Sequence, residues 1–285
     1  MLGQFLITFR EALEAALIVA IMLSYFGRTR THSLSRYVWY GVYLAVAASL
    51  GLGAAIWFAY GALPEASKLL FEATAAFVAV AVLSSMIYWM AVKGRHLRQE
   101  MEHRIELITT QGAIVGLVSV AFIVVFREAL ETVLFLTPFL LIDFAGTFAG
   151  MCAGIIAAIV FAYVVFIAGM KINLRSFFYF TSILLILLAG GLAGYGVHEL
   201  VEYFEETGIN IGWLGQPAYA LSIPEDSLFH HKGIIGSIFA VMFGYTVSAE
   251  WARIIVHFTY LAVALPLTIW IYRKGNGKRT EKKVV

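Results

Sequence analysis

Charge, cysteine and proline are all scarce in this chain. Only 13% of its 285 residues are charged, whereas 61% are hydrophobic. The single cysteine, Cys152, excludes an intramolecular disulfide and a thiolate metal cluster. Five prolines and the lack of a low-complexity tract leave no segment with the composition of a flexible linker, which favours one domain. The first residues have no basic segment of the kind that opens a signal peptide, so we expect the first apolar run to remain as a helix.

Long apolar runs are abundant instead. Most of them are long enough, at about 1.5 Å of rise per residue, to cross about 30 Å of hydrocarbon. We therefore predict an all-α integral membrane protein with seven transmembrane helices. The predicted spans are about 2–26, 37–61, 70–92, 112–141, 147–169, 177–200 and 254–272.

One six-residue sequence, Phe-Arg-Glu-Ala-Leu-Glu, occurs at 9–14 and again at 126–131, inside the first and fourth predicted spans. Each repeat contains three spans, which is an odd number, so the second repeat enters the membrane from the opposite side. This indicates a 3+3 inverted repeat plus a C-terminal helix, as in many transporters. Within a single domain, 1–285, we expect repeat 1 at about 1–92, repeat 2 at about 112–200, an outer loop at 201–253, a last helix at 254–272 and a basic tail at 273–285.

Lysine and arginine are distributed unequally between the two sides. The loops after the first, third and fifth spans, together with the tail, contain 15 of them, and the alternate loops contain only Lys68, Lys232 and Arg253. The positive-inside rule places the N-terminus outside and the C-terminus in the cytoplasm of a cell membrane. The predicted outer side is rich in carboxylates, which either form a solvated rim or collect cations.

The motif charges are costly in a membrane, at roughly 2.5–3.5 kcal/mol each near the bilayer centre. Residues i, i+1 and i+4 share one face of a helix, so Arg10, Glu11 and Glu14 lie together. Arg127, Glu128 and Glu131 do the same in the second copy. Two such helices facing each other would gather four carboxylates and two guanidinium groups, with a formal charge of −2. Such a cluster suits a hard cation of charge two or three.

A purely structural explanation pairs each arginine with the glutamate four residues later. It accounts for Arg10 with Glu14 and for Arg127 with Glu131, but it leaves Glu11 and Glu128 unpaired. A mixed interpretation, in which the arginines orient the carboxylates and release them to an arriving cation, stays open. A di-iron enzyme is disfavoured because the motif spans contain Glu-x-x-Glu and no histidine, where such sites use Glu-x-x-His. We therefore expect no enzyme activity.

A second set of polar residues lies on the predicted outer side. Glu72 is either a helix N-terminal charge or a ligand that relays a metal. The pattern of a histidine beside carboxylates predicts a possible outer-face metal relay made of Glu72, His198, Glu199, Glu202 and Glu250. His230 and His231 are a weaker pair of ligand candidates, and the apolar segment Gly233–Val247 is compatible with a re-entrant segment.

The Arg-Glu-x-Leu-Glu motif in the first and fourth of seven spans resembles the oxidase-dependent iron transporter family, the high-affinity iron permeases of the iron/lead transporter superfamily. The similarity covers nearly the whole chain and includes Phe71-Glu72, Trp89-Met90, Gly196 to Leu200, and Gly244-Tyr245 with Glu250. Most relatives have glycine where this chain has Ala12 and Ala129.

The resemblance implies import of Fe(III) or Fe(II), with transport roles for Arg10, Glu11, Glu14, Arg127, Glu128 and Glu131. It also implies a separate extracytoplasmic oxidase or iron-binding protein as partner, with iron as the transported substrate and no permanently bound cofactor. No nucleic-acid partner is expected. Alternatives are a transporter of another divalent metal such as lead or manganese, or a proton-linked transporter of an organic cation.

Overall fold

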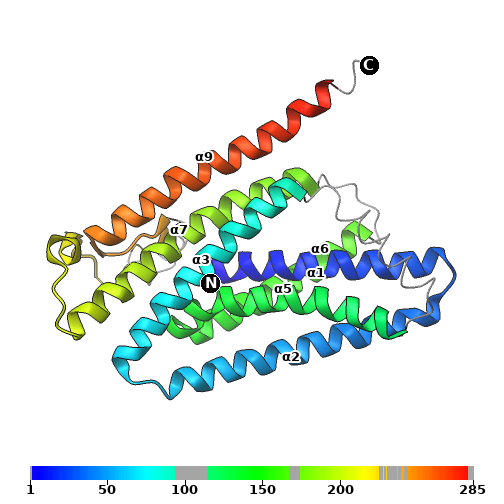
Figure 1. The fold of residues 1–285 in the computed structure, drawn as a ribbon, viewed down its shortest axis with the longest axis horizontal. Coiled ribbons are helices and arrows are strands. Elements are labelled where there is room, and N and C mark those ends of the chain that lie inside the picture. Colours follow the sequence, from blue (N-terminus) through cyan, green and yellow to red (C-terminus); the bar gives the residue numbers. More distant parts are fainter. Residues whose placement is uncertain are drawn as a thin grey trace.

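The computed structural model describes residues 2–93, 114–166, 174–224 and 243–281, together with positions 227, 229, 236, 239 and 240. Seven long helices make up most of this part of the chain (Figure 1). They are α1 (Leu2–Arg28), α2 (Ser35–Gly61), α3 (Glu65–Lys93), α5 (Ile114–Ile142), α6 (Phe144–Phe166), α7 (Leu174–Glu206) and α9 (Trp251–Glu281). The prediction of an all-α membrane protein with seven long helices is confirmed.

Apolar composition explains most of these helices. Among the described residues, the spans within α2, α3, α6, α7 and α9 have the length and hydropathy of membrane-crossing helices. Helices α1 and α5 are of similar length, at 27 and 29 residues, but each also contains the three charges of one motif. Some ends differ from the sequence prediction, since α3 begins at Glu65, α7 continues to Glu206 and α9 begins at Trp251.

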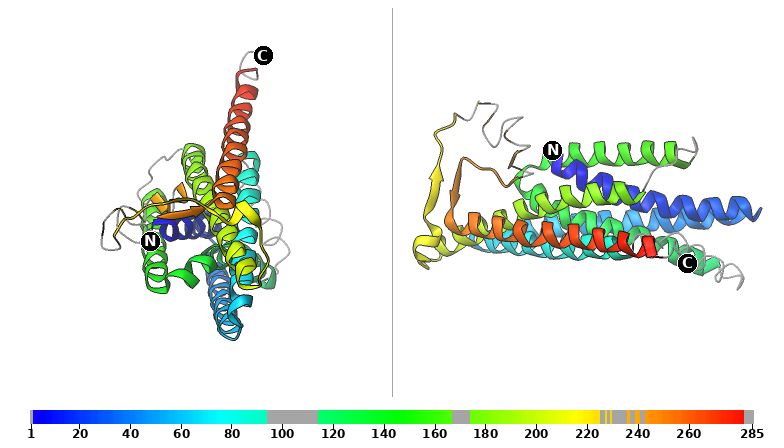
Figure 2. Two further views of the ribbon diagram at one scale, coloured as in Figure 1. Left: turned by 90° about the vertical axis from the view of Figure 1, so that its left-hand side faces the viewer. Right: turned by 90° about the horizontal axis from the view of Figure 1, so that it is seen from above.

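The packing of the helices follows a pseudo-twofold pattern. Helices α1 and α5 run in opposite directions and lie side by side near the middle of the bundle (Figures 1 and 2). The first helix of each repeat packs against the second helix of the other, so that α1 contacts α6 and α2 contacts α5, while the two third helices, α3 and α7, contact each other. This exchange of partners is the arrangement expected of an inverted repeat. Helix α9 has no counterpart in the repeats and packs against α7 and α3.

Two glycines allow the closest of these approaches. A Cβ atom added at Gly154 of α6 would lie 2.8 Å from both the Phe5 carbonyl oxygen and the Phe9 backbone nitrogen of α1. A Cβ atom added at Gly41 of α2 would lie 2.6 Å from the Val118 carbonyl oxygen of α5. Both crossings therefore depend on the lack of a side chain, as small residues allow in membrane helices.

The main apolar core joins both repeats. It includes Ile7 of α1, Leu83 of α3, Phe135 of α5 and Leu185 of α7, all buried. Because these four helices share one core, the two motif helices are fixed against each other by apolar packing, and not by their charges alone.

At one end of the bundle, which we call the acidic end, α3 begins and α7 ends. The acidic end is defined by the carboxylates of Glu72, Glu199, Glu202 and Glu250. After α7 the chain forms a short 3₁₀ helix, η2 (Gly212–Gly215), and strand β1 (Pro217–Ala220). Strand β1 pairs antiparallel with β2 (Ser248–Glu250), immediately before α9. This small sheet was not foreseen in the predicted outer loop. His230, His231 and most of Gly233–Val247 lie outside the described residues.

Candidate metal path through the two motifs

Arg10 is the centre of a fully buried ion cluster on α1. Its Nη1 atom lies 2.7 Å from Glu11 Oε1, and its Nη2 atom lies 2.8 Å from Glu14 Oε1. Nη1 also donates a hydrogen bond to Met86 Sδ of α3, at 2.7 Å. Only 2% of the Arg10 side chain is exposed. One guanidinium therefore pairs with two carboxylates that share its face of the helix and compensates one of their two charges.

The second motif, on α5, has a more open environment. Arg127 Nε lies 2.9 Å from Glu131 Oε1, and 48% of the Arg127 side chain is exposed. Its Cζ atom lies 5.1 Å from the centroid of the Trp89 ring, a cation–π contact with α3. Glu128, buried beside it, has no ion pair among the described residues.

Carboxylates from the two motifs meet between α1 and α5. Glu11, Glu128 and Glu131 each place one carboxylate oxygen within 4.8 Å of the others. The Oε2 atom of each is buried and has no hydrogen-bond partner among the described residues. Buried anionic oxygens without partners are costly, and a cation held between them would satisfy them. The cluster thus has the donor type and spacing of a site for a hard cation.

The sequence-based pairing scheme is correct for Arg10 with Glu14 and for Arg127 with Glu131. It is wrong for Glu11, which also pairs with Arg10. The adjacent residues 10 and 11 lie about 100° apart around the helix, close enough for the long arginine side chain to reach both carboxylates. The structure therefore brings three of the four motif carboxylates together, and Glu14 stays beside Arg10.

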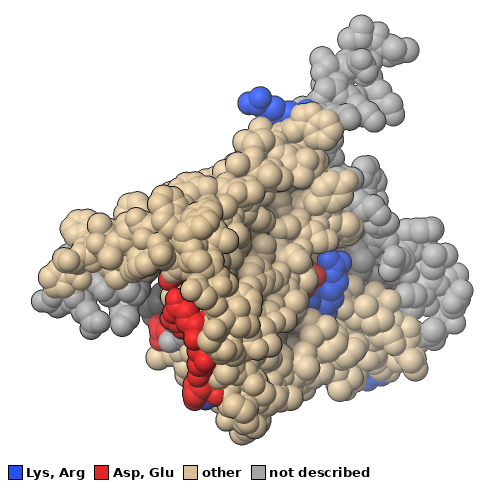
Figure 3. Space-filling view, turned by 60° about the vertical axis from the view of Figure 1, so that its left-hand side comes forward, with Lys and Arg blue, Asp and Glu red and all other residues tan. Residues whose placement is uncertain are grey.

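The acidic end contains a second group of polar side chains. His198 of α7 contacts two carboxylates, with Nδ1 at 2.9 Å from Glu250 Oε1 and Nε2 at 3.4 Å from Glu202 Oε1. Burial of Glu250 favours its neutral form, but the hydrogen bond with His198, a backbone hydrogen bond and the nearby His198 and Arg253 side chains together hold the pKa of Glu250 below its usual value. His198, Glu199 and Glu202 have ligand atoms within 4.8 Å of one another. Figure 3 shows acidic side chains gathered in one stripe, beside a broad uncharged surface.

Glu72 is not a helix N-terminal charge, because α3 begins seven residues earlier, at Glu65. The apolar pattern alone placed the start of this helix too late. The Glu72 carboxylate accepts a hydrogen bond from Tyr60 Oη, at 2.5 Å to Oε1, and another from Tyr195 Oη to Oε2. Tyr195 thus connects Glu72 to α7, and Tyr60 connects it to α2.

Four of these contact residues were given no role by the sequence: Met86, Trp89, Tyr60 and Tyr195. Tyr195 precedes Glu199 by four residues on α7, and this spacing was a signal that the two side chains share a face. Trp89 carried part of the family resemblance. Tyr60 and Met86 had no such signal, because their contacts join different helices.

Comparison with known proteins adds independent findings. A model described as the iron permease FTR1 family matches residues 1–272. An uncharacterized protein of Archaeoglobus fulgidus is 44% identical over 285 residues, covering 100% of this chain and 99% of the relative. The ferrous iron permease EfeU of Yersinia pestis is 34% identical over 270 residues, covering 94% of this chain and 93% of the relative. The protein of the same name in Escherichia coli O6:K15:H31 is 32% identical over 279 residues, with 96% and 98% covered. No solved structure is significantly similar to the chain.

Proposed function

Because the chain belongs to the iron permease FTR1 family, we propose that the carboxylates of its two motifs form the path by which iron crosses the membrane. Glu11, Glu128 and Glu131 bind the ion between α1 and α5, and Glu14 joins them when Arg10 releases it. The family is one of transporters, so the iron is cargo and not a cofactor.

One observation carries this proposal. Carboxylate oxygens of Glu11, Glu128 and Glu131, which come from two helices 117 residues apart in sequence, lie within 4.8 Å of one another. Each of these residues has a second oxygen that is buried and unpartnered among the described atoms. A purely structural ion-pair cluster would leave no such excess of acceptors.

The two arginines have distinct roles in this proposal. Arg10 keeps Glu11 and Glu14 ordered at 2.7 and 2.8 Å while no ion is bound. An arriving cation competes with Arg10 for these oxygens. When iron binds, its positive charge takes the place of the guanidinium beside the carboxylates, so their negative charges stay compensated. Arg127 holds Glu131 in the same way, and its release costs less free energy because its side chain is half exposed.

The acidic end supplies the ion in this scheme. Glu72, His198, Glu199, Glu202 and Glu250 raise the local cation concentration and pass iron toward the motifs. An imidazole with carboxylates is a suitable donor set for iron. The charge bias favours an orientation with this end outside the cell and the C-terminus in the cytoplasm. The Yersinia pestis and Escherichia coli relatives are named ferrous iron permeases, which favours Fe(II) as the ion transported, delivered by a separate extracytoplasmic iron-binding protein. A separate extracytoplasmic oxidase as partner would instead supply Fe(III).

Iron uptake into proteoliposomes tests the motif assignment. We expect Glu131→Gln to lower the initial rate of uptake by about tenfold or more, since loss of one metal ligand or its support costs at least this much. Glu65→Gln is the matched control, because the Glu65 side chain is 80% exposed and pairs only with Lys68 among the described residues.

Equal uptake by wild type and Glu131→Gln would refute the motif path. Arms with Fe(II) under reductant and with Fe(III) separate the oxidation states. Competition by manganese, by lead and by an organic amine tests the alternative substrates. The assay is run first without any partner protein, then with outer-face proteins added.

A further inference from the structure

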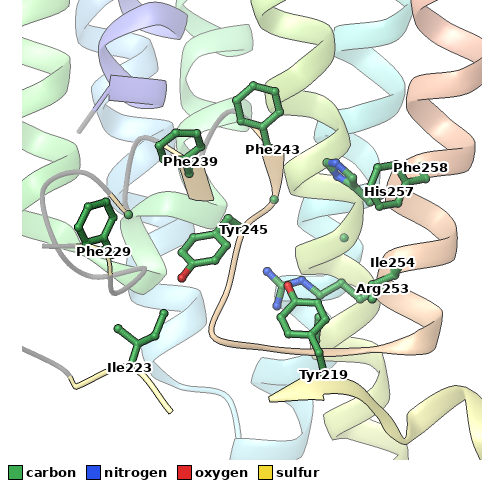
Figure 4. A pocket seen from close by; sticks show the side chains of 14 residues that line it. Tyr219, Ile223, Phe229, Phe239, Phe243, Tyr245, Arg253, Ile254, His257 and Phe258 are labelled. Carbon is green, nitrogen blue, oxygen red and sulfur yellow. The ribbon is translucent and has the colours of Figure 1, made fainter. Parts of the chain in front are cut away.

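A pocket of about 680 Å³ lies between α7, the beginning of α9 and the chain around β2, and no motif residue lines it (Figure 4). Aromatic and other apolar side chains form most of its wall. The rings include Phe229, Phe239, Phe243, Tyr245 and Phe258. A wall of this kind suits a hydrocarbon chain and offers little to a hydrated metal ion.

Two polar side chains of α9 face this apolar space, and they are four residues apart on one side of the helix. Figure 4 shows the Arg253 guanidinium and the His257 ring pointing from α9 toward the middle of the pocket. Arg253 is partly buried and has no ion pair or hydrogen bond within the part of the chain that the structure describes. Only 6% of His257 is exposed, and its Nδ1 atom has no partner there. An unpaired cation and an unsatisfied ring nitrogen therefore share one cavity.

Glycine keeps the space beside these two groups open. Gly244 has a φ of +64°, and a Cβ atom there would lie 2.9 Å from His257 Nδ1. A Cβ atom at Gly194 of α7 would lie 3.3 Å from Arg253 Cγ. A side chain at position 244 would thus occupy the position from which a ligand atom reaches His257.

The charge of Arg253 decides the class of ligand. A fixed cation in an apolar pocket repels iron, so the pocket is not part of the metal path, and it attracts an anion. Arg253 is the third residue of α9, near the membrane–water boundary, where the charged head groups of lipids lie. Next to the pocket, α9 presents exposed apolar side chains, with Ile255 42%, Phe258 64% and Val263 62% exposed. Such a surface faces lipid in a membrane protein.

We propose that this pocket binds an anionic phospholipid of the surrounding membrane. Its phosphate lies against Arg253 and accepts a hydrogen bond from His257, and an acyl chain fills the aromatic wall and continues along α9. The phosphate neutralises Arg253, which follows Glu250 of β2 by three residues. The site is separate from the iron path and does not depend on it.

Thermal unfolding of the full chain in a neutral detergent tests the site. We expect short-chain phosphatidylglycerol to raise the unfolding temperature in a saturable way. Phosphatidylcholine with the same chains and inorganic phosphate should not. Arg253→Gln should weaken the apparent affinity for phosphatidylglycerol by about tenfold, which corresponds to about 1.4 kcal/mol. Arg273→Gln, at an exposed position of the same helix, should leave it unchanged.

An equal shift with both lipids, or an unchanged shift in Arg253→Gln, would overturn the proposal. A shift with inorganic phosphate alone would mean a site for a free oxyanion and would overturn the lipid assignment. The wild-type comparison of the two lipids decides the matter even if Arg253→Gln does not fold. Iron uptake in the same preparation is an independent readout, so failure here is distinguishable from failure of the motif path.

Discussion

The two copies of Phe-Arg-Glu-Ala-Leu-Glu are identical in sequence, but their surroundings differ. Arg10 is 2% exposed and contacts two carboxylates and a methionine sulfur. Arg127 is 48% exposed and contacts one carboxylate and the Trp89 ring. Helix α3 supplies both extra contacts, with Met86 at one motif and Trp89, near the end of the helix, at the other. The same arginine is thus buried among its partners in the first repeat and half exposed in the second.

This asymmetry is what an inverted-repeat transporter shows when one side of its central site is closed. The helix without a counterpart, α9, packs against α7 and α3 and breaks the twofold pattern. We expect the motif on α1 to act as the rigid half of the cation site and the motif on α5 to act as the half through which the ion exchanges. The predictions below test that difference.

The largest difference should appear when each arginine is removed. Arg10→Gln leaves Glu11 and Glu14 buried without their cation, and breaking a buried pair in this way costs about 3–5 kcal/mol. Arg127→Gln removes a half-exposed pair, for which we expect about 1 kcal/mol or less. Thermal unfolding in detergent compares the two variants directly. Equal losses of stability would show that the two motifs are energetically alike and would end the comparison.

Glycine-to-alanine changes at the two repeat crossings should have a smaller effect, of similar size in both repeats. Alanine at Gly154 or Gly41 would overlap backbone atoms of α1 or α5, and overpacking of this kind costs about 1–3 kcal/mol. Gly51→Ala is the control on α2, because a Cβ atom there has no atom within 4 Å. The free energy of unfolding is the readout. A neutral Gly154→Ala variant would contradict the close contact of α6 with α1.

The smallest effect concerns the open motif alone. Trp89→Leu removes a cation–π contact of about 0.5–1 kcal/mol, so iron uptake should change by about two- to fivefold while the protein stays folded. Trp57→Leu is the matched control, since Trp57 packs against Phe144 and has no cation–π contact among the described residues. Uptake that changes equally in both variants would show that the contact of Trp89 with Arg127 has no specific effect on transport.

Much of this architecture follows from local properties of the sequence. Long apolar runs predicted all seven helices, because a helix that crosses lipid must satisfy its backbone internally and present apolar side chains. The helical period placed Arg10, Glu11 and Glu14 on one face, and the three-span spacing predicted that α1 and α5 run in opposite directions. The interpretation of Glu72 as a helix N-terminal charge failed for a local reason, since the polar first turns of α3 resemble a loop.

The hydropathy and spacing of the sequence did not predict the contacts between helices. The sequence contains no signal that Tyr60 and Tyr195 both bond to Glu72, or that Met86 and Trp89 distinguish the two motifs. The contact of His198 with Glu250 joins residues 52 positions apart. It depends on the small sheet that holds Glu250, and no periodicity predicts the course of the loop between them.

The sequence by itself determined the helices, their alternating directions, the repeat and the identity of the motif charges, because each depends on hydropathy or on spacing along one helix. Only the tertiary structure decided which carboxylates meet, why Arg10 is buried and Arg127 is half exposed, and that Arg253 and His257 share a pocket. Those features depend on the distances at which separate helices pack, and packing is set by the shapes of side chains from all of them at once.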